Sequence, residues 1–271
     1  MLRSISLIFM AAPLFGQAAV ADLLTAKTIA RLAAFDSAFD GVIGVAAIDL
    51  KTGRQLCHHC ETEFPTASTI KVPLLVEVTR LIRAGKLFYD QPVPVRKDEV
   101  VLASAVYEKA ALASGSLTVR ELITIMIQNS DNSATNKLID LVGGMAAVNT
   151  RMDEMNLPGI RLRRKMIDLP AAKADRENIA TALDMARLSE MLYSTKVLDP
   201  TSSREILDFI ALVEGDVRRT VTPVRTATKT GSLAVYSAYL GNESPVPGVT
   251  RIFIDHFRKL DRSNAAGRFL E

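Results

Sequence analysis

Three short polar strings, widely separated along the chain, constrain its fold more than any other feature. They are Ser68-Thr69-Ile70-Lys71, Ser130-Asp131-Asn132 and Lys229-Thr230-Gly231-Ser232. Each string offers a hydroxyl together with an amine or an amide, and acyl transfer through a serine nucleophile needs such groups around one reacting carbonyl. Because the strings lie so far apart, a fold can use them together only by gathering them into a single pocket.

The size and charge of the chain set broad limits on its class. The chain has 271 residues, of which 48% are hydrophobic and 23% charged, an ordinary globular composition. That length allows one large domain or two intertwined ones. The formal net charge of +3 is small, and the lysines and arginines are scattered. We therefore expect no nucleic-acid partner.

The first residues have the pattern of an export signal. Arg3 supplies a positive charge, an apolar stretch begins at Leu7, and Ala19-Val20-Ala21 is an A-x-A cleavage site ahead of Asp22. This pattern predicts a signal peptide over residues 1–21 and a periplasmic or secreted protein. A buried N-terminal helix is the alternative. The apolar run is too short to span a bilayer and no later stretch is longer, so we expect no integral membrane segment.

Hydrophobic periodicity predicts helices through most of the chain and strands near both ends. Helices are expected over 23–39, from about Ser68 to Gly85, from Thr118, from about 133 to 143 and from Thr181 to 193. A hairpin is expected around 42–50, and strands over 224–229, 233–240 and 249–254.

This order of elements predicts an α+β fold, a sandwich of helices and sheet. A mostly antiparallel sheet is built from both chain ends and packed with terminal helices, and an all-helical insert is added to it. We assign residues 22–66 and 185–271 to a discontinuous α/β domain and residues 67–184 to the helical domain. The active site is expected in the cleft between them.

Ser68 and Lys71 are three residues apart at the start of a predicted helix, so their side chains share a face. A serine hydroxyl is inert until a base removes its proton. Lysine serves as that base where desolvation and nearby positive charge depress its pKa. The alternative is a solvated first helical turn without catalytic function.

The other two strings have similar pairs of interpretations. The string Ser130-Asp131-Asn132 lies in a tight connection between two predicted helices. There Ser130 could relay a proton and Asn132 could bind a substrate carbonyl. The alternative is a linker that only caps a helix. At a strand end, Gly231 would let a substrate approach the backbone, and Lys229 with its hydroxyl neighbours suits a carboxylate. The alternative there is an ordinary strand end with an exposed lysine.

The only two cysteines, Cys57 and Cys60, flank His58 and His59. A metal site of the usual kind would need a second ligand pair, which the sequence lacks at the usual spacing. A redox pair would be expected at the start of a helix, and this pair follows a strand pattern instead. A local disulfide and two free thiols both remain open, and we expect no metal.

Taken together and in this order, the three strings resemble the motif set S-x-x-K, S-D-N and K-T-G of the class A β-lactamase and penicillin-binding-protein group of serine hydrolases. The resemblance covers residues 42–254. It extends to Phe64-Pro65-Thr66-Ala67, to Val106-Tyr107-Glu108-Lys109 and to Thr118-Val119-Arg120-Glu121-Leu122. It implies the β-lactamase/transpeptidase-like fold.

The resemblance also implies roles for individual residues. Ser68 would be the nucleophile and Lys71 a base or proton relay. Ser130 would pass a proton to the leaving nitrogen, and Asn132 would bind a substrate amide. The substrate carboxylate would be held by the third string, which comprises Lys229, Thr230, Gly231 and Ser232. Backbone N–H groups of Ser68 and Ser232 would form the oxyanion hole.

The same resemblance implies the ligands and partners. The substrate would be a small molecule, either a β-lactam or a D-alanyl peptide, and no metal or organic cofactor would be needed. We expect a monomer.

One part of the family pattern is missing. Class A enzymes carry a glutamate, four residues before an asparagine, that activates the water for deacylation. Residues 162–178 contain no E-x-x-x-N string, and Pro170 stands where several relatives place an acid. Asp168, Asp175 and Glu177 remain as candidate bases, although Glu177 beside Arg176 has the pattern of an ion-paired residue.

The missing glutamate predicts slow deacylation and leaves three functions open. The first is a β-lactam hydrolase. The second is a D-alanyl-D-alanine peptidase or transpeptidase. The third is a binding protein that is acylated once and does not turn over.

Overall fold

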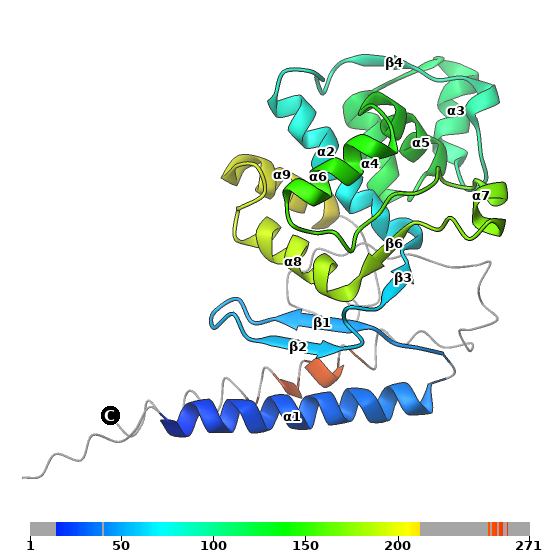
Figure 1. Ribbon diagram of the computed structural model, residues 1–271. Helices are drawn as coiled ribbons and strands as arrows, with labels where there is room; N and C mark the ends of the chain where they lie inside the picture. Colours follow the sequence, from blue (N-terminus) through cyan, green and yellow to red (C-terminus); the bar gives the residue numbers. More distant parts are fainter. Residues whose placement is uncertain are drawn as a thin grey trace, which may run out of the picture.

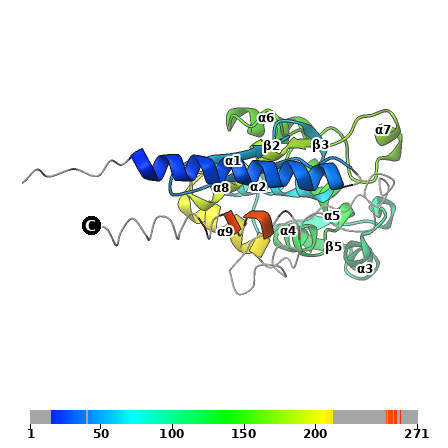
Figure 2. The ribbon, with the colours of Figure 1, turned by 90° about the horizontal axis from the view of Figure 1, so that it is seen from below.

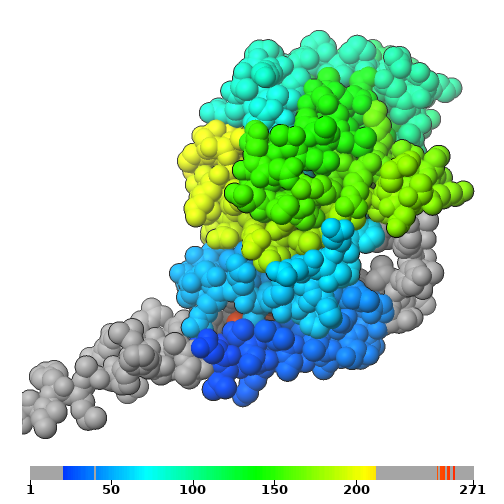
Figure 3. Space-filling model, in the orientation of Figure 1, coloured from blue at the N-terminus to red at the C-terminus, as the bar shows by residue number. Residues whose placement is uncertain are grey.

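The chain folds into a layer of helices set on a β-hairpin, with one long helix on the far side of the hairpin (Figure 1). This computed structural model describes residues 15–39, 41–211, 249, 251–253, 255–256 and 259. The space-filling view in Figure 3 shows the same three layers in contact.

The described helices are α1 Phe15–Ala38, η1 Ala67–Ile70, α2 Lys71–Arg83, η2 Lys97–Glu99, α3 Ala105–Ala113, α4 Val119–Gln128, α5 Asn132–Leu141, α6 Met145–Glu154, α7 Leu169–Lys173, α8 Ala182–Tyr193 and α9 Pro200–Ala211. The described strands are β1 Val45–Ile48, β2 Gln55–His58, β3 Glu63–Pro65, β4 Pro92–Pro94, β5 Ser116–Thr118 and β6 Ile179–Thr181. They pair as β1–β2, β3–β6 and β4–β5, all antiparallel.

Helix α2 forms the centre of the helical layer. Its residues Leu74, Leu75, Val76 and Val78 are almost fully buried, as expected of a helix that is surrounded by other elements. It packs against α4, α5, α6 and α9. Because α2 begins at Lys71, this packing fixes the position of the first motif.

Local capping signals correctly predict where two of the surrounding helices begin. Thr118 and Glu121 form a capping box at the start of α4, with Thr118 Oγ1 accepting from the backbone N–H of Glu121. Thr181 caps α8 by accepting from the N–H of Asp184.

The β1–β2 hairpin lies between α8 and α1. On its α1 side, Leu32, Ile43, Val45 and Ile252 form a small buried cluster. Figure 2 shows the described C-terminal helical residues beside α1. Elements from both ends of the chain therefore pack against one hairpin, and the predicted α+β class is confirmed.

The predicted strand over 249–254 is wrong for every described residue in that range. Val249, Arg251, Ile252 and Phe253 are helical. Their β-branched content favours a strand, but Val249, Ile252 and Phe253 follow helical spacing and pack against the α1 cluster. The predicted strands over 224–229 and 233–240 lie outside the described residues, and the division into two domains stays a prediction.

Cys57 and Cys60 form a disulfide, which closes the turn after β2. Of the two alternatives left open by the sequence, the structure therefore has the paired form. At the N-terminus, α1 continues through the predicted cleavage point between Ala21 and Asp22. Among the described helices, none combines the length and the apolar character that a bilayer crossing requires.

Candidate active site

The first motif lies on a tight turn that leads into α2. Ser68 belongs to the 3-10 turn η1, and Lys71 is the first residue of α2. Ala67, just before the serine, has a left-handed φ of 43°. Thr66, which precedes the turn, attaches it to the segment that contains Asn178: the backbone N–H of Thr66 donates to the carbonyl of Asn178 at 2.8 Å. The pairing of β3 with β6 continues this attachment.

The second motif forms the connection between α4 and α5. Asp131 caps α5, with Oδ1 accepting from the N–H of Ala134 at 2.9 Å, and its Oδ2 accepts from the N–H of Tyr107 at 3.2 Å. Ser130 has a left-handed φ of 55°. Capping is therefore performed by Asp131, while Ser130 and Asn132 face Lys71.

The structure brings four of the predicted site residues together. Ser130 Oγ donates to Ser68 Oγ at 2.8 Å. Lys71 Nζ donates to Ser130 Oγ at 3.0 Å, to the Ser130 carbonyl at 2.6 Å and to Asn132 Oδ1 at 3.0 Å. The Lys71 side chain is fully buried. A continuous hydrogen-bonded path thus runs from the amine to the predicted nucleophile.

The Asn132 side chain is held at both ends. Its Oδ1 accepts from Lys71 and its Nδ2 donates to the carbonyl of Leu102 at 2.9 Å. An amide nitrogen carries two N–H groups, and within the described part of the chain only one of them has an acceptor, so the second is the candidate donor to a ligand. The third motif, Lys229-Thr230-Gly231-Ser232, lies outside the described residues.

Two asparagine side chains fix the segment of residues 161–178: Asn136 attaches it to α5, and Asn178, which lies in the segment, binds the segment's own backbone. Asn136 on α5 donates from Nδ2 to the Met166 carbonyl at 3.1 Å and accepts the Met166 N–H at 2.7 Å. Asn178 Oδ1 accepts the N–H groups of Arg163 and Arg164 at 2.7 and 2.9 Å. Neither asparagine could be predicted from the sequence, because the partners of their side chains are backbone groups, which have no sequence signal.

The three candidate acids of this segment have separate positions. Asp168 caps α7 by accepting from the N–H of Ala171 at 3.0 Å. Asp175 is exposed. Glu177 is buried and forms the expected ion pair, but its partner is Arg164 at 2.7 Å rather than the neighbouring Arg176.

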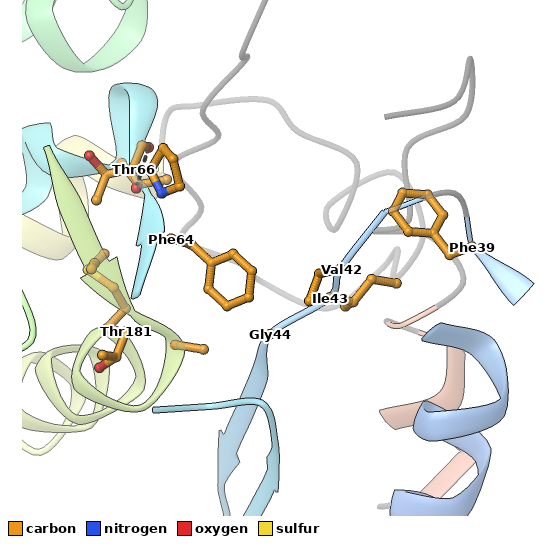
Figure 4. Close-up of a pocket in the computed structure, with 12 residues that line it drawn as sticks. Phe39, Val42, Ile43, Gly44, Phe64, Thr66 and Thr181 are labelled. Atoms are coloured by element: carbon orange, nitrogen blue, oxygen red, sulfur yellow. Dashed lines mark hydrogen bonds between the residues drawn. The ribbon is translucent and has the colours of Figure 1, made fainter. Parts of the chain in front are cut away.

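A hollow of about 290 Å³ lies beside the first motif (Figure 4). Its described lining is mostly apolar, with Phe64 and Thr66 at one end and Phe39 at the other. The Phe64 ring covers Gly44 so closely that a Cβ added to Gly44 would clash with it. The lining includes Thr66 and Thr69 but not the hydrogen-bonded serines, so we do not assign catalysis to this hollow.

Comparisons with known proteins show the family and the fold of the chain. The model of the β-lactamase enzyme family matches residues 25–241. An ancestral (GNCA) class A β-lactamase is 29% identical with a TM-score of 0.70, over 76% of this chain and 80% of that one. A variant of the last common ancestor of Gram-negative bacteria β-lactamase class A is 31% identical with a TM-score of 0.70, over 76% and 78%.

A third match adds support for the fold alone. A β-lactamase from Chitinophaga pinensis DSM 2588 is 24% identical with a TM-score of 0.70, over 76% of this chain and 78% of that one. Family, fold and the hydrogen-bonded serine–lysine cluster lead to one conclusion: this chain belongs to the β-lactamase enzyme family.

Proposed function

We propose that this protein is an exported serine hydrolase that opens β-lactam rings through an acyl-serine intermediate. The observation that carries the proposal is the path from Lys71 Nζ through Ser130 Oγ to Ser68 Oγ, with steps of 3.0 and 2.8 Å. Membership of the family supports the same reaction class.

In the proposed acylation, Ser68 Oγ attacks the carbonyl carbon of the lactam. The hydroxyl proton moves through Ser130 Oγ to Lys71 Nζ. An ammonium makes the three donated hydrogen bonds of Lys71 Nζ that the structure shows. To accept the proton, Lys71 must first be neutral, a form that its burial favours. The bonds along the path must then reverse, so that Ser68 Oγ donates to Ser130 Oγ and Ser130 Oγ donates to Nζ. As the C–N bond breaks, the proton returns through Ser130 to the leaving nitrogen. The product is an ester between Ser68 and the opened substrate.

Substrate binding is assigned to the remaining motif residues. The second N–H of Asn132 Nδ2 would donate to the side-chain amide of the substrate. Lys229, Thr230, Gly231 and Ser232 would hold the substrate carboxylate by charge-assisted hydrogen bonds. The backbone N–H groups of Ser68 and Ser232 would stabilise the oxyanion. This chemistry needs no metal or organic cofactor, and we propose that the enzyme acts as a monomer.

Deacylation is expected to be slow. A water molecule must be activated to attack the ester, and losing a general base typically costs roughly 10²- to 10⁴-fold in rate. Asp168 is engaged in capping α7, and Glu177 is paired with Arg164. We therefore expect the acyl-enzyme to form readily and to accumulate.

The same arrangement of acids favours a second candidate function. A D-alanyl-D-alanine peptidase or transpeptidase uses the same three motifs without the lactamase glutamate. An acylatable protein that does not turn over would need only the first step.

One experiment separates these functions. Purified protein is mixed with a chromogenic cephalosporin, and both the released product and the mass of the protein are followed. Sustained turnover, with a transient mass increase, supports the proposed hydrolase. A stoichiometric burst with a persistent mass increase contradicts turnover, and release of D-alanine from a peptide substrate would then identify the peptidase.

The variants Ser68→Ala and Ser189→Ala form a matched pair for this assay. Ser68→Ala removes the proposed nucleophile and should abolish the mass increase. Ser189 is an exposed serine on α8, so its alanine variant should behave as the wild type. If the Ser68→Ala protein still acquires the acyl group, Ser68 is not the nucleophile.

The proposed export has its own test. Full-length protein is produced in a Gram-negative host, and the N-terminus of the periplasmic fraction is sequenced. We expect the mature chain to begin at Asp22, because Ala19-Val20-Ala21 has the small residues that signal peptidase requires. An uncleaved cytoplasmic protein would contradict the proposed localisation.

A further inference from the structure

Three potential metal ligands meet where α1 approaches the end of β2. Oδ2 of Asp36 lies 2.9 Å from Nε2 of His58 and 3.3 Å from Nε2 of His59. One ligand atom from each residue lies within 4.8 Å of the other two. Figure 1 shows that β2 ends beside the C-terminal part of α1. The cysteine–histidine string alone does not predict the third ligand, because Asp36 lies 22 residues before His58 in the chain.

The backbone turns both histidines toward the same carboxylate. Successive side chains of a strand point to opposite faces, so adjacent histidines would normally diverge. His58 is the last residue of β2, and His59 has a left-handed φ of 46°, which bends the chain at that point. The two rings therefore lie close, with centroids 4.3 Å apart. The Cys57–Cys60 disulfide spans both residues and closes the turn around them.

The carboxylate is also oriented for ligation. Oδ1 of Asp36 accepts the backbone N–H of Ile43 at 2.8 Å, which directs Oδ2 toward the imidazoles. Hydrogen bonds of this kind to the second oxygen commonly orient metal-ligating carboxylates.

We propose that Asp36, His58 and His59 form a binding site for a transition-metal dication such as Zn²⁺. The ligand atoms would be Asp36 Oδ2 and the Nε2 atoms of both histidines, with water in the remaining position. Two imidazoles and one carboxylate suit Zn²⁺, Cu²⁺ or Ni²⁺, whereas Mg²⁺ and Ca²⁺ prefer oxygen ligands alone.

The spacing of the ligand atoms agrees with this assignment. In a tetrahedral site with metal–ligand distances near 2.1 Å, neighbouring ligand atoms are about 3.4 Å apart. The separation of 3.3 Å between Asp36 Oδ2 and His59 Nε2 lies near that value. His58 Nε2 lies at 2.9 Å, within hydrogen-bond distance of the same oxygen, so the ion would replace that hydrogen bond and the two atoms would move apart by about 0.5 Å. The His59 side chain is 50% exposed, against 11% for His58 and 14% for Asp36. His59 is therefore free to adjust when the ion binds, and water can reach the remaining position.

The bound ion would join α1 to the hairpin and would not take part in the proposed serine chemistry. None of its three ligands belongs to the Ser68–Lys71–Ser130 cluster. Because only the folded chain brings the ligands together, binding should raise the unfolding temperature in proportion to the logarithm of the free ion concentration.

The test uses full-length, disulfide-intact protein stripped of metal by a chelator. Binding of Zn²⁺ is measured by competition with a chromophoric zinc chelator, and Tm is measured with and without the ion. We expect one Zn²⁺ per chain and a higher Tm when Zn²⁺ is present. His59→Ala should weaken binding at least about tenfold, the loss typical even for groups that only orient a ligand.

Two further variants keep the test decisive. Glu61→Gln removes an exposed carboxylate from the same turn and should bind Zn²⁺ as the wild type does. Asp36→Asn keeps the shape of the side chain and should lose both the affinity and the rise in Tm. The proposal is wrong if the protein binds no stoichiometric Zn²⁺. It is also wrong if His59→Ala and Asp36→Asn bind Zn²⁺ as tightly as Glu61→Gln does. In either case Asp36 is only a carboxylate that contacts two imidazoles.

Discussion

Two residues with left-handed backbone frame the candidate nucleophile. Ala67 precedes Ser68, and Ser130 supplies the hydroxyl that contacts it. Such conformations cost of order 1–3 kcal/mol for a residue other than glycine and persist where the surrounding structure enforces them. Here Thr66 is tied to Asn178 on one side, and Asp131 is tied to α5 and Tyr107 on the other. The strain is thus held next to the groups that are proposed to react.

The Ser130 hydroxyl is predicted to be required for fast acylation. Removing it breaks the path between Lys71 and Ser68, so Ser130→Ala and Ser130→Gly should each slow acylation by roughly 10²- to 10⁴-fold. The rate is measured as the mass increase of the protein during a single turnover with a cephalosporin.

Comparing the two variants separates chemistry from backbone strain. Glycine adopts the left-handed conformation of residue 130 without steric cost, whereas alanine does not. Equal losses in both variants indicate that the hydroxyl matters. A normal rate for Ser130→Gly would show instead that only the backbone conformation is needed.

At the scale of elements, a buried ion-pair cluster joins α2 to α6. Glu77 is 1% exposed and accepts from Arg80 at 2.6 and 2.8 Å. Arg151 on α6 approaches the same carboxylate at 3.4 Å. The hydrogen bonds that Arg80 donates to Glu77 raise the pKa of Arg80, against a smaller effect of burial, so the guanidinium stays charged.

Glu77→Ala should therefore destabilise the protein strongly. The substitution leaves two partly buried guanidinium groups, 28% and 20% exposed, without this carboxylate. Breaking a fully buried pair from one side costs about 3–5 kcal/mol, which sets the upper limit here. The free energy of unfolding is measured by urea denaturation. Glu154→Ala is the matched control. It removes the other ion-pair partner of Arg151, and because the Glu154 side chain is 52% exposed, the loss in the free energy of unfolding should be only about 0–1 kcal/mol. Similar losses for both variants would contradict a special role of the buried pair.

The segment of residues 161–178 offers a place to restore the missing base. Asn136 holds both backbone groups of Met166, one helical turn beyond Asn132, whose Oδ1 contacts Lys71. The backbone at position 166 is thus fixed beside α5, and the Met166 side chain is buried there. Position 170, four residues later, is Pro170, so two substitutions at these positions create the E-x-x-x-N string.

Met166→Glu combined with Pro170→Asn should speed deacylation. A positioned carboxylate base is worth roughly 10²- to 10⁴-fold in rate, so the steady-state turnover of a cephalosporin should rise while the acylation rate changes little. The control is Met166→Gln with Pro170→Asn, which has the same shape without the base. If both double variants turn over at the same rate, the absence of a glutamate at this place does not limit the proposed deacylation.

Across the whole molecule, the sequence predicts best what depends on local signals. Thr118 and Thr181 begin their helices as predicted because capping involves residues only three positions apart. The contact of Asp36 with His58 and His59 could not be predicted, because it depends on how α1 packs against the hairpin. For the same reason the predicted strand at Ile252 is wrong: a β-branched side chain fits a strand or a helix, and packing against α1 decides between them.

The candidate site could be predicted only in part. The order of the motifs predicts that Ser68, Lys71 and Ser130 lie together. The backbone carbonyls of Leu102 and Asn178, which bind Asn132 and Thr66, could not be predicted, because backbone groups have no sequence signal.

The two ends of the chain are joined by polar contacts as well as by the apolar cluster. Arg31 on α1 pairs with Asp255 at 3.1 Å, and Thr28 Oγ1 lies 2.8 Å from Nδ1 of His256. His256 is 5% exposed. Burial lowers the pKa of His256 below its usual value of 6.5, although a backbone hydrogen bond with Leu24 and the charge of Asp49 act in the opposite direction.

This lowered pKa predicts that mild acid weakens the joint between the chain ends. The folded state favours the neutral imidazole, while the unfolded chain takes up a proton below about pH 6.5. The contribution of His256 to the free energy of unfolding is therefore full above that pH and falls as the pH decreases toward the lowered pKa. Urea denaturation of the wild type at pH 7.5 and 5.5 should show this decrease, and His256→Gln, which does not titrate, should show a smaller one. Thr28→Val is the control: it keeps the buried imidazole and should retain the pH dependence of the wild type. If His256→Gln loses as much stability between the two pH values as the wild type does, the imidazole is not the group that responds.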